Sequence, residues 1–394
     1  RCGMHTALVE KTVFPGGLAT SGLVNFYLPL CDGQGKQVSF GISEELLHLS
    51  LKYGPGHIPA GWGKLDGGQR KEQPPARLQS RFSPASFILA LDEILEGSGV
   101  DLWLDTLACL PLMEGRRVTG VEVENKSGRG QIRAGCVVDA TGDADLAFRA
   151  AAPCAEGDNW LSIWALQTSL EKDREAVGQT QVEDEESEFQ DKDRTPVKRK
   201  HPAALLTGVH LGGDAVGNGH PEEAEKQPGT NGRSVTRFVL ESRRLLRDYY
   251  QRCQAEIGRE AQFPLTLPAM AQLRTTRRIC GVEEMIDGQA NQRRETSVGL
   301  AGDWRQRGMV WEIPYGALLP AQISGLLTAG RCIASGGDAW EVTRVIPAAA
   351  VSGQAAGAAA ALAVKQKCSP EQLEPAAVQA ALSTRGIPLH VDEI

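Results

Sequence analysis

Short runs of apolar residues, each ending in a polar or glycine residue, give this chain its first structural pattern. Residues 6–9 form one such run and end at Glu10, residues 136–138 form a second, and residues 325–330 form a third that runs into a glycine. Apolar runs of this length have the character of buried strands. A further series at residues 101–107, 117–125 and 130–134 is separated by short turns and predicts an antiparallel meander.

Other segments place their apolar residues at helical spacing. Residues 42–51 carry two glutamates in the first predicted turn, which suits a helix N-terminus. Ser83 is a candidate N-cap, with Pro84 at the first helical position. Residues 238–257 predict a third helix, and Pro347 opens a fourth that is rich in alanine.

The alanine-rich segment also decides whether a membrane span is expected. Residues 345–364 carry no charge and are about long enough to cross a bilayer. Their hydrophobicity is weak, however, because most of them are Ala and Gly. We therefore expect a buried helix whose small side chains let the backbone of other elements approach it closely. Residues 1–10 have no apolar signal-peptide core, and we expect a soluble, cytoplasmic protein without a membrane partner.

Composition narrows the range of functions. The chain has 394 residues, a formal net charge of −7 and an ordinary charged content of 23%. An acidic balance argues against a nucleic acid as the main partner. The nine cysteines include no CxxC pair, which disfavours a disulfide reductase, and no spacing of His and Cys predicts a metal site.

Glu10 stands where dinucleotide-binding folds place an acidic residue, at the end of a strand, to bind the ribose hydroxyls of adenosine. A strand-ending carboxylate is also common without that role. The GxGxxG loop that should precede it by about twenty residues would lie before residue 1. We expect it upstream, in a longer natural chain; the alternative is a protein that binds the dinucleotide poorly.

Three segments together resemble the FAD-dependent oxidoreductases of the glutathione-reductase-like superfamily. The first follows Glu10 and is rich in glycine and small hydroxyl residues; the second is a strand that ends in a small-Thr-Gly turn; the third is a strand, an arginine and a helix near the C-terminus. The resemblance implies FAD as cofactor and assigns to its binding Glu10, Lys11, Gly16, Gly17, Ala19, Thr20, Ser21, Gly22, Thr141, Gly142, Asp143, Gly330, Arg331, Arg344, Val345, Gly353, Gln354 and Ala355.

The physical chemistry of these residues suits that assignment. Small residues let the backbone lie against a flavin, and the hydroxyls of Thr20 and Ser21 can bond to it. The N-terminus of the helix at Pro347 carries partial positive charge, which stabilises the negative N1/O2 edge of a reduced flavin, and Arg344 would add to that field. The alternatives are a generic turn, a plain strand-turn-helix and a packing helix with a surface arginine.

The family's fold then implies an α/β protein with two units. The first is a Rossmann-like FAD-binding domain, a parallel sheet with an antiparallel meander, and the second an α+β substrate domain. We expect residues 1–30, 78–152 and 322–370 in the FAD domain, residues 31–77 and 153–321 in the substrate domain, and residues 371–394 in a C-terminal helical tail.

Our first hypothesis for the reaction is hydride transfer between a small organic substrate and flavin N5. Arg274 and Arg277 are candidates for binding an anionic substrate, because planar guanidinium groups suit carboxylates; a structural ion-pair cluster is the alternative. His57 is a candidate acid or base, or else a solvated histidine. The electron acceptor or donor, the substrate and the oligomeric state cannot be inferred from the sequence.

Two other hypotheses stay open. A flavin-dependent RNA-modifying protein has its only support in the basic run at residues 198–201, against the acidic net charge. A non-catalytic remnant of the flavoprotein fold would have lost its nucleotide site. The segment between residues 156 and 232 carries no motif that points to any of the three.

Overall fold

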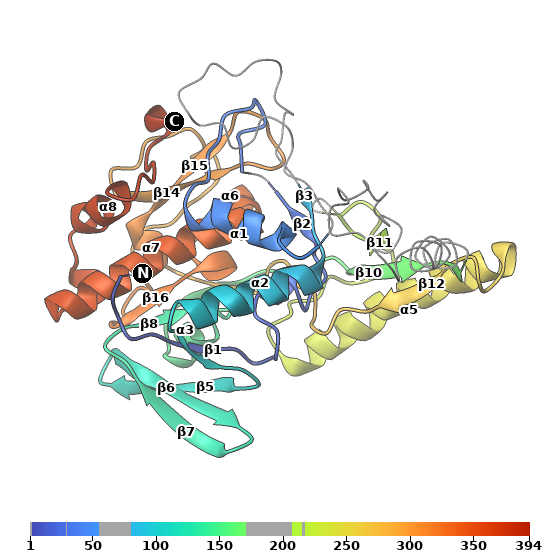
Figure 1. Ribbon diagram of the computed structural model, residues 1–394, viewed down its shortest axis with the longest axis horizontal. Helices are drawn as coiled ribbons and strands as arrows, with labels where there is room; N and C mark the ends of the chain where they lie inside the picture. Colours follow the sequence, from blue (N-terminus) through green and yellow to red (C-terminus); the bar gives the residue numbers. More distant parts are fainter. Residues whose placement is uncertain (1, 29, 55–79, 171–206, 215–216) are drawn as a thin grey trace, which may run out of the picture.

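The computed structural model describes residues 2–28, 30–54, 80–170, 207–214 and 217–394 of the chain. Within these ranges it mixes helices with seven small sheets (Figure 1). The α-helices are α1 (Ile42–Leu51), α2 (Pro84–Gly97), α3 (Asp145–Arg149), α5 (Gly232–Ile257), α6 (Gly337–Thr343), α7 (Ile346–Gln366) and α8 (Pro375–Ser383). The mixed helix-and-strand architecture agrees with the predicted α/β class.

Two pairs of parallel strands stand where a parallel sheet was predicted. Strand β1 (Ala7–Val9) pairs with β4 (Asp101–Trp103), and β8 (Val137–Asp139) pairs with β16 (Leu326–Thr328). Among the described residues each pair is a separate two-stranded sheet. Val9 and Val137 nevertheless contact the same small apolar cluster. The strand and GxGxxG loop expected upstream of residue 1 remain a prediction.

The meander differs from its prediction in one strand. It consists of β5 (Leu107–Glu114), β6 (Arg117–Asn125) and β7 (Gly128–Arg133), at the foot of the molecule in Figure 1. Residues 101–103, expected in the meander, pair in parallel with β1 instead. The sequence was misleading because β5 contains Pro111, a residue that weakens a strand pattern; the ladder accommodates it at a register shift.

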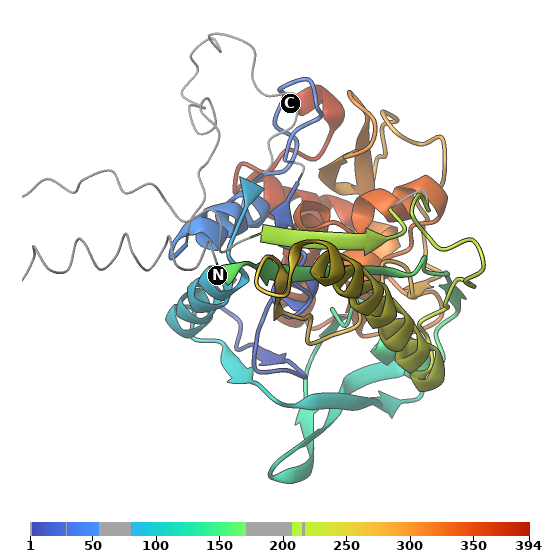
Figure 2. The same cartoon turned by 90° about the vertical axis from the view of Figure 1, so that its right-hand side faces the viewer.

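A second antiparallel sheet lies on the other side of the molecule. Its strands are β10 (Ser162–Thr168), β11 (Thr207–Gly212) and β12 (Phe263–Thr266), with β10 in the centre. The long helix α5 lies across β10 and β11 (Figure 2). Ile163 and Ala165 of β10 pack on Leu246 of α5. Because side chains alternate along a strand, Ser162 and Trp164 point to the opposite face.

The remaining strands form three two-stranded antiparallel sheets. They are β2 (Phe26–Tyr27) with β3 (Ser80–Arg81), β9 (Cys154–Glu156) with β13 (Arg277–Ile279), and β14 (Ser297–Gly302) with β15 (Val310–Pro314).

The largest apolar core is built around α7. Ala348, Val351, Ala355 and Ala359 recur at helical spacing and are all at most 3% exposed. In the described part of the chain, α7 is the one helix long and apolar enough to cross a membrane, and 56% of its most apolar stretch is buried inside the structure. Its contacts with β14, α1 and α8 agree with the prediction of a helix packed against other elements.

The small side chains of α7 allow β14 to approach it very closely. A Cβ atom added at Gly299 would lie 2.4 Å from Cγ1 of Val351. We therefore expect Gly299→Ala to lower the free energy of unfolding by about 1–3 kcal/mol through overpacking, measured by urea denaturation.

Gly357→Ala is the matched control. Gly357 lies in α7 with no atom within 4 Å of an added Cβ, so alanine there should raise stability by up to about 1 kcal/mol through helix propensity. Equal effects of the two substitutions would show that β14 and α7 are not in contact as described.

Candidate active site

The glycine-rich loop after β1 is held in a bent conformation that glycine favours. Gly16 has a φ of 106° and Gly17 a φ of 53°, and the hydroxyl of Thr20 donates to the carbonyl of Pro15 at 2.7 Å. Residues Gly17–Ala19 form a short 3₁₀ turn, not the start of an α-helix. Ala19 packs in a cluster with Phe87 of α2, and Ile346 at the start of α7 contacts the same cluster. The loop therefore lies beside the helix N-terminus that the third segment supplies.

Two buried polar atoms in and beside this loop have no partner in the described part of the chain. They are the hydroxyl of Ser21, a residue 5% exposed, and the side-chain amide nitrogen of Asn25, a residue 2% exposed. Leaving such groups unpaired is costly. The backbone beside them is engaged, since the carbonyl of Ser21 accepts from the amide of Ala269 at 2.9 Å. The unpaired side-chain atoms are those expected where a polar ligand completes the hydrogen bonding.

Glu10 and Lys11 lie between this loop and the second segment. The carboxylate of Glu10 accepts from the backbone amide of Thr12 at 2.8 Å and from its hydroxyl at 2.9 Å. Lys11 lies close enough to Asp143 to help lower the pKa of that carboxyl. The structure thus brings the residues after β1 next to those after β8.

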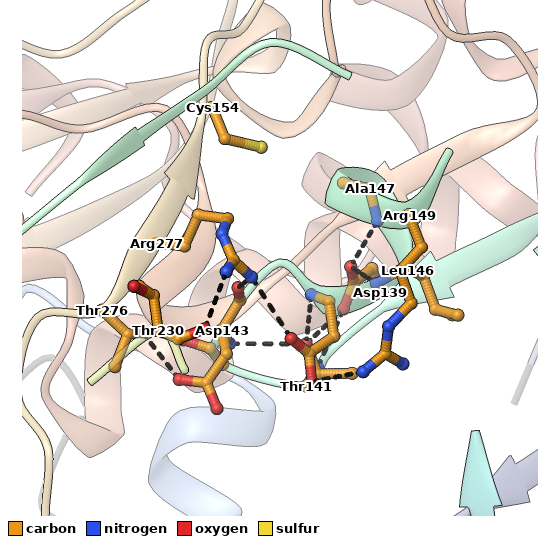
Figure 3. A network of polar contacts seen from close by, with 12 residues as sticks. Asp139, Thr141, Asp143, Leu146, Ala147, Arg149, Cys154, Thr230, Thr276 and Arg277 are labelled. Atoms are coloured by element: carbon orange, nitrogen blue, oxygen red, sulfur yellow. Dashed lines mark hydrogen bonds and ion pairs between the residues drawn. The ribbon is translucent and has the colours of Figure 1, made fainter. Parts of the chain in front are cut away.

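Asp139 shapes the turn after β8 (Figure 3). One carboxylate oxygen accepts from the amide and hydroxyl of Thr141, and the other accepts from the amides of Leu146 and Ala147 at the start of α3. Burial raises the pKa of the Asp139 carboxyl, although these hydrogen bonds act in the opposite direction. The turn places Gly142 at a φ of 77°, with its carbonyl facing Arg331.

Asp143 and Arg331 join the second and third segments. The guanidinium of Arg331 donates from Nε to the carbonyl of Gly142 at 2.6 Å and from Nη2 to Oδ1 of Asp143 at 2.5 Å. Thr276 donates its hydroxyl to the same carboxylate oxygen at 2.6 Å. Burial alone would raise the pKa of Asp143, but the charge of Arg331 and these hydrogen bonds lower it. Asp143 is therefore an anion held by protein groups.

The third segment places its residues around the N-terminus of α7. Val345 is the N-cap residue and offers no side-chain hydrogen bond to the first turn. Gly330 donates its amide to the hydroxyl of Ser352 at 2.9 Å. Gly353 has open space where a Cβ would stand, whereas Ala355 is fully buried in the core.

Arg344 and Gln354 both have protein partners. Arg344 forms an ion pair with Glu341, and its side chain is 13% exposed. The side-chain oxygen of Gln354 accepts from the amide of Ile42 at 2.9 Å and so connects α7 to α1.

Protein groups surround Arg277 (Figure 3), although its Nε has no hydrogen-bond partner among the described residues. It is 5% exposed, lies 3.3 Å from Asp145 and 3.6 Å from Glu156, and its guanidinium lies 3.9 Å from the centre of the Phe148 ring. These contacts match the alternative of a structural ion-pair cluster. They connect β13 to α3 and to the turn after β8.

The partners of Arg274 differ from those of Arg277. Its guanidinium donates to the carbonyls of Gly213 and Asp214 at 2.8 and 3.0 Å and to the hydroxyl of Ser162 at 3.3 Å. All three acceptors are neutral, and no described carboxylate lies within 4.0 Å of it. Burial and the nearby charge of Arg344 lower the pKa of Arg274 to about 10. Arg274 and Arg344 therefore lie close enough to repel each other.

Three residues beside Arg274 were missed by the sequence analysis, namely Ser162, Trp164 and His210. They lie on the face of β10 and β11 that α5 leaves uncovered, in the segment where no motif was found. The apolar run at residues 163–166 was the available signal, and it predicts only a buried strand. His57 and the basic run at 198–201 lie outside the described residues. No cluster of potential metal ligands occurs in the ranges the structure describes.

Several solved structures are similar to this chain along most of its length. One is a geranylgeranyl bacteriochlorophyll reductase-like protein from Thermoplasma acidophilum, at 13% identity and a TM-score of 0.42, covering 98% of this chain and 77% of that one. Another is the myxobacterial FAD-dependent halogenase CndH, at 14% identity and a TM-score of 0.42, covering 94% and 72%. No curated protein matches the chain.

The family itself follows from the sequence match. A family model described as FAD dependent oxidoreductase matches residues 1–382, nearly the whole chain. The predicted cofactor and enzyme class are thereby confirmed. The chain belongs to the FAD-dependent oxidoreductase family, and FAD is its cofactor.

Proposed function

We propose that this flavoenzyme transfers a hydride between a small anionic organic substrate and N5 of FAD. The observation that carries the anionic substrate is Arg274, a partly buried cation without a carboxylate partner in the described residues. A guanidinium in this state is stabilised by an anion that binds it. FAD, when bound, supplies the acceptor for two electrons and a proton.

The described residues fit FAD in three respects. Ser21 and Asn25 offer buried polar atoms with no protein partner. In the glycine-rich loop Gly17 has open space where a Cβ would stand, so backbone without side-chain bulk is available there. The uncapped N-terminus of α7 offers positive potential for the anionic edge of a reduced flavin. We assign cofactor binding to the loop at 16–22, the turn at 141–143 and the start of α7.

The substrate would then lie between α6 and the face of β10 opposite α5. Arg344 at the end of α6 and Arg274 beside β10 interact electrostatically, so the two elements face a common space. Glu341 neutralises part of this charge by pairing with Arg344, and Asp214 attracts Arg274 from further away. A substrate carboxylate near Arg274 would remove the remaining repulsion between the two guanidinium groups.

Arg274→Met tests the anion site. We expect it to weaken binding of small carboxylates (acetate, oxamate and benzoate as probes) by roughly ten- to hundredfold, the loss of about 1.5–3 kcal/mol expected for a charge-assisted hydrogen bond. Isothermal titration calorimetry on the FAD-loaded, full-length protein measures the affinity for these carboxylates. Arg252→Met, which removes an exposed arginine of α5, is the control and should bind normally. Equal affinity in the two variants, or no binding to the unmodified protein, would contradict the proposal.

Glu10→Ala tests the cofactor site. Removal of the carboxylate should raise the Kd for FAD about ten- to hundredfold if it bonds the ribose, measured by flavin fluorescence on titration into the flavin-free full-length protein. Because Glu10 also accepts from Thr12, Thr12→Val is the control: it loosens the same turn and keeps the carboxylate. An unchanged Kd in the Glu10→Ala variant would place that residue away from the cofactor.

A further inference from the structure

His210 lies beside Arg274 on the face of the β10–β11 sheet opposite α5. It is the direct cross-strand partner of Trp164, and the two rings stack with centroids 4.6 Å apart and an angle of 27° between them. Its Nε2 lies 3.4 Å from the hydroxyl of Ser162, the hydroxyl that accepts from Arg274. An imidazole nitrogen, a hydroxyl and a guanidinium therefore converge at one place.

The stacking on Trp164 fixes the orientation of the imidazole without using its nitrogens. Among the described residues the ring forms one hydrogen bond, with the hydroxyl of Ser162. At 3.4 Å this is a long distance for such a bond. Nε2 can accept a proton from a bound molecule once that molecule replaces the Ser162 hydroxyl at this nitrogen. By contrast, His220 uses both ring nitrogens, since Nδ1 accepts from the amide of Leu161 and Nε2 lies 2.8 Å from the carbonyl of Ala224.

The charged groups around His210 favour its neutral form. Burial lowers its pKa from the ordinary value, the nearby Arg274 lowers it further, and Asp214 acts in the opposite direction. Arg344 and its partner Glu341 act on Arg274 from α6. At neutral pH the ring is therefore a base that can accept a proton, which is the state that oxidation of an alcohol requires.

We propose that His210 is the catalytic base and that the substrate is a small 2-hydroxycarboxylate. This inference rests on the proposed function. The carboxylate would bind Arg274, and the hydroxyl next to it would face His210. The hydroxyl then gives its proton to Nε2 of His210, and the C–H bond of the same carbon breaks, with both electrons leaving as hydride to FAD. A C=O bond forms, so the substrate is oxidised by two electrons to a 2-oxocarboxylate and the flavin is reduced by two.

The two guanidinium groups of the site favour a neutral hydroxyl over an ammonium group, whereas Glu341 and Asp214 act in the opposite direction. A 2-aminocarboxylate carries an ammonium group at neutral pH, and two guanidinium groups, Arg274 and Arg344, lie close to this space. Like charges in a partly buried site repel strongly. A neutral hydroxyl meets no such repulsion.

Reduction of the bound flavin in the FAD-loaded, full-length protein tests the base. DL-lactate, glycolate and mandelate are mixed anaerobically with the protein, and flavin bleaching is followed by stopped flow between about pH 5 and 9. Because protonated His210 cannot accept a proton, the rate should rise with pH through the histidine pKa and then level off. His210→Gln should lower the rate roughly 10²–10⁴-fold and abolish this rise, whereas His48→Gln, at an exposed histidine of α1, should change neither.

Two further measurements separate the possible failures. In the flavin-free protein, the imidazole of His210 is titrated by NMR, and its pKa should lie below the ordinary value of about 6.5. Oxamate affinity should be unchanged in the His210→Gln variant, which also shows that the variant is folded.

Each outcome has one meaning. Normal flavin reduction in the His210→Gln variant, or faster reduction by L-alanine than by all three hydroxy acids, overturns the inference while the anion site stands. Failure of the unmodified protein to bind oxamate overturns the proposed function itself. Oxamate binding without flavin reduction by any of the three acids overturns the substrate class.

Discussion

The ion pair between Asp143 and Arg331 connects the parts of this protein that its chain keeps far apart. Arg331 follows β16, near the C-terminal end, and Asp143 follows β8, almost two hundred residues earlier. The Arg331 side chain is 9% exposed and the Asp143 side chain 26%, and Thr276 from the central region donates to the same carboxylate. Arg331 is the more buried partner, so removal of Asp143 would leave its charge uncompensated and destabilise the fold. The turn at 141–143, the start of the β16–α7 segment and the strand β13 therefore keep their relative positions together.

Arg277 reinforces the same junction from a different direction. It donates to the carbonyl of Asp143 and pairs with Asp145 and Glu156, so that it fills the space behind the turn. Its neighbour in the sequence, Arg274, is three residues away and faces a different region with neutral acceptors. This contrast is the basis for our proposal that Arg277 holds the fold together and that Arg274 binds a ligand.

The sequence predicted those parts of the fold that local patterns determine. The helix at Pro84 forms with Ser83 as its N-cap, and the buried helix at Pro347 forms because its alanines recur at helical spacing. The parallel partner of β1 was missed, because residues 101–107 look like any other short strand and only tertiary pairing decides where they lie. Pro111 hid the strand β5 for a related reason.

The proposed cofactor side and the proposed substrate side of the candidate site could not be predicted equally well from the sequence. The residues at 16–22 and 141–143 are glycines and small hydroxyl residues, the types that let the backbone come close to a cofactor. They could therefore be recognised in the sequence as candidates for cofactor binding. His210, Trp164 and Ser162 meet only because β10 and β11 pair, and a lone histidine between apolar residues gives no sign of its neighbours. Arg274 was picked out with Arg277, but only the three-dimensional contacts distinguish their roles.

A crystal structure of the full-length protein with FAD and oxamate tests the central claim most directly. The account predicts the flavin ring against Ser21 and the start of α7, the hydroxyl of Ser21 hydrogen-bonded to the cofactor, and the oxamate carboxylate on Arg274 within reach of His210. FAD bound elsewhere, with the Ser21 hydroxyl still unpaired and Arg274 without an anion, would contradict it.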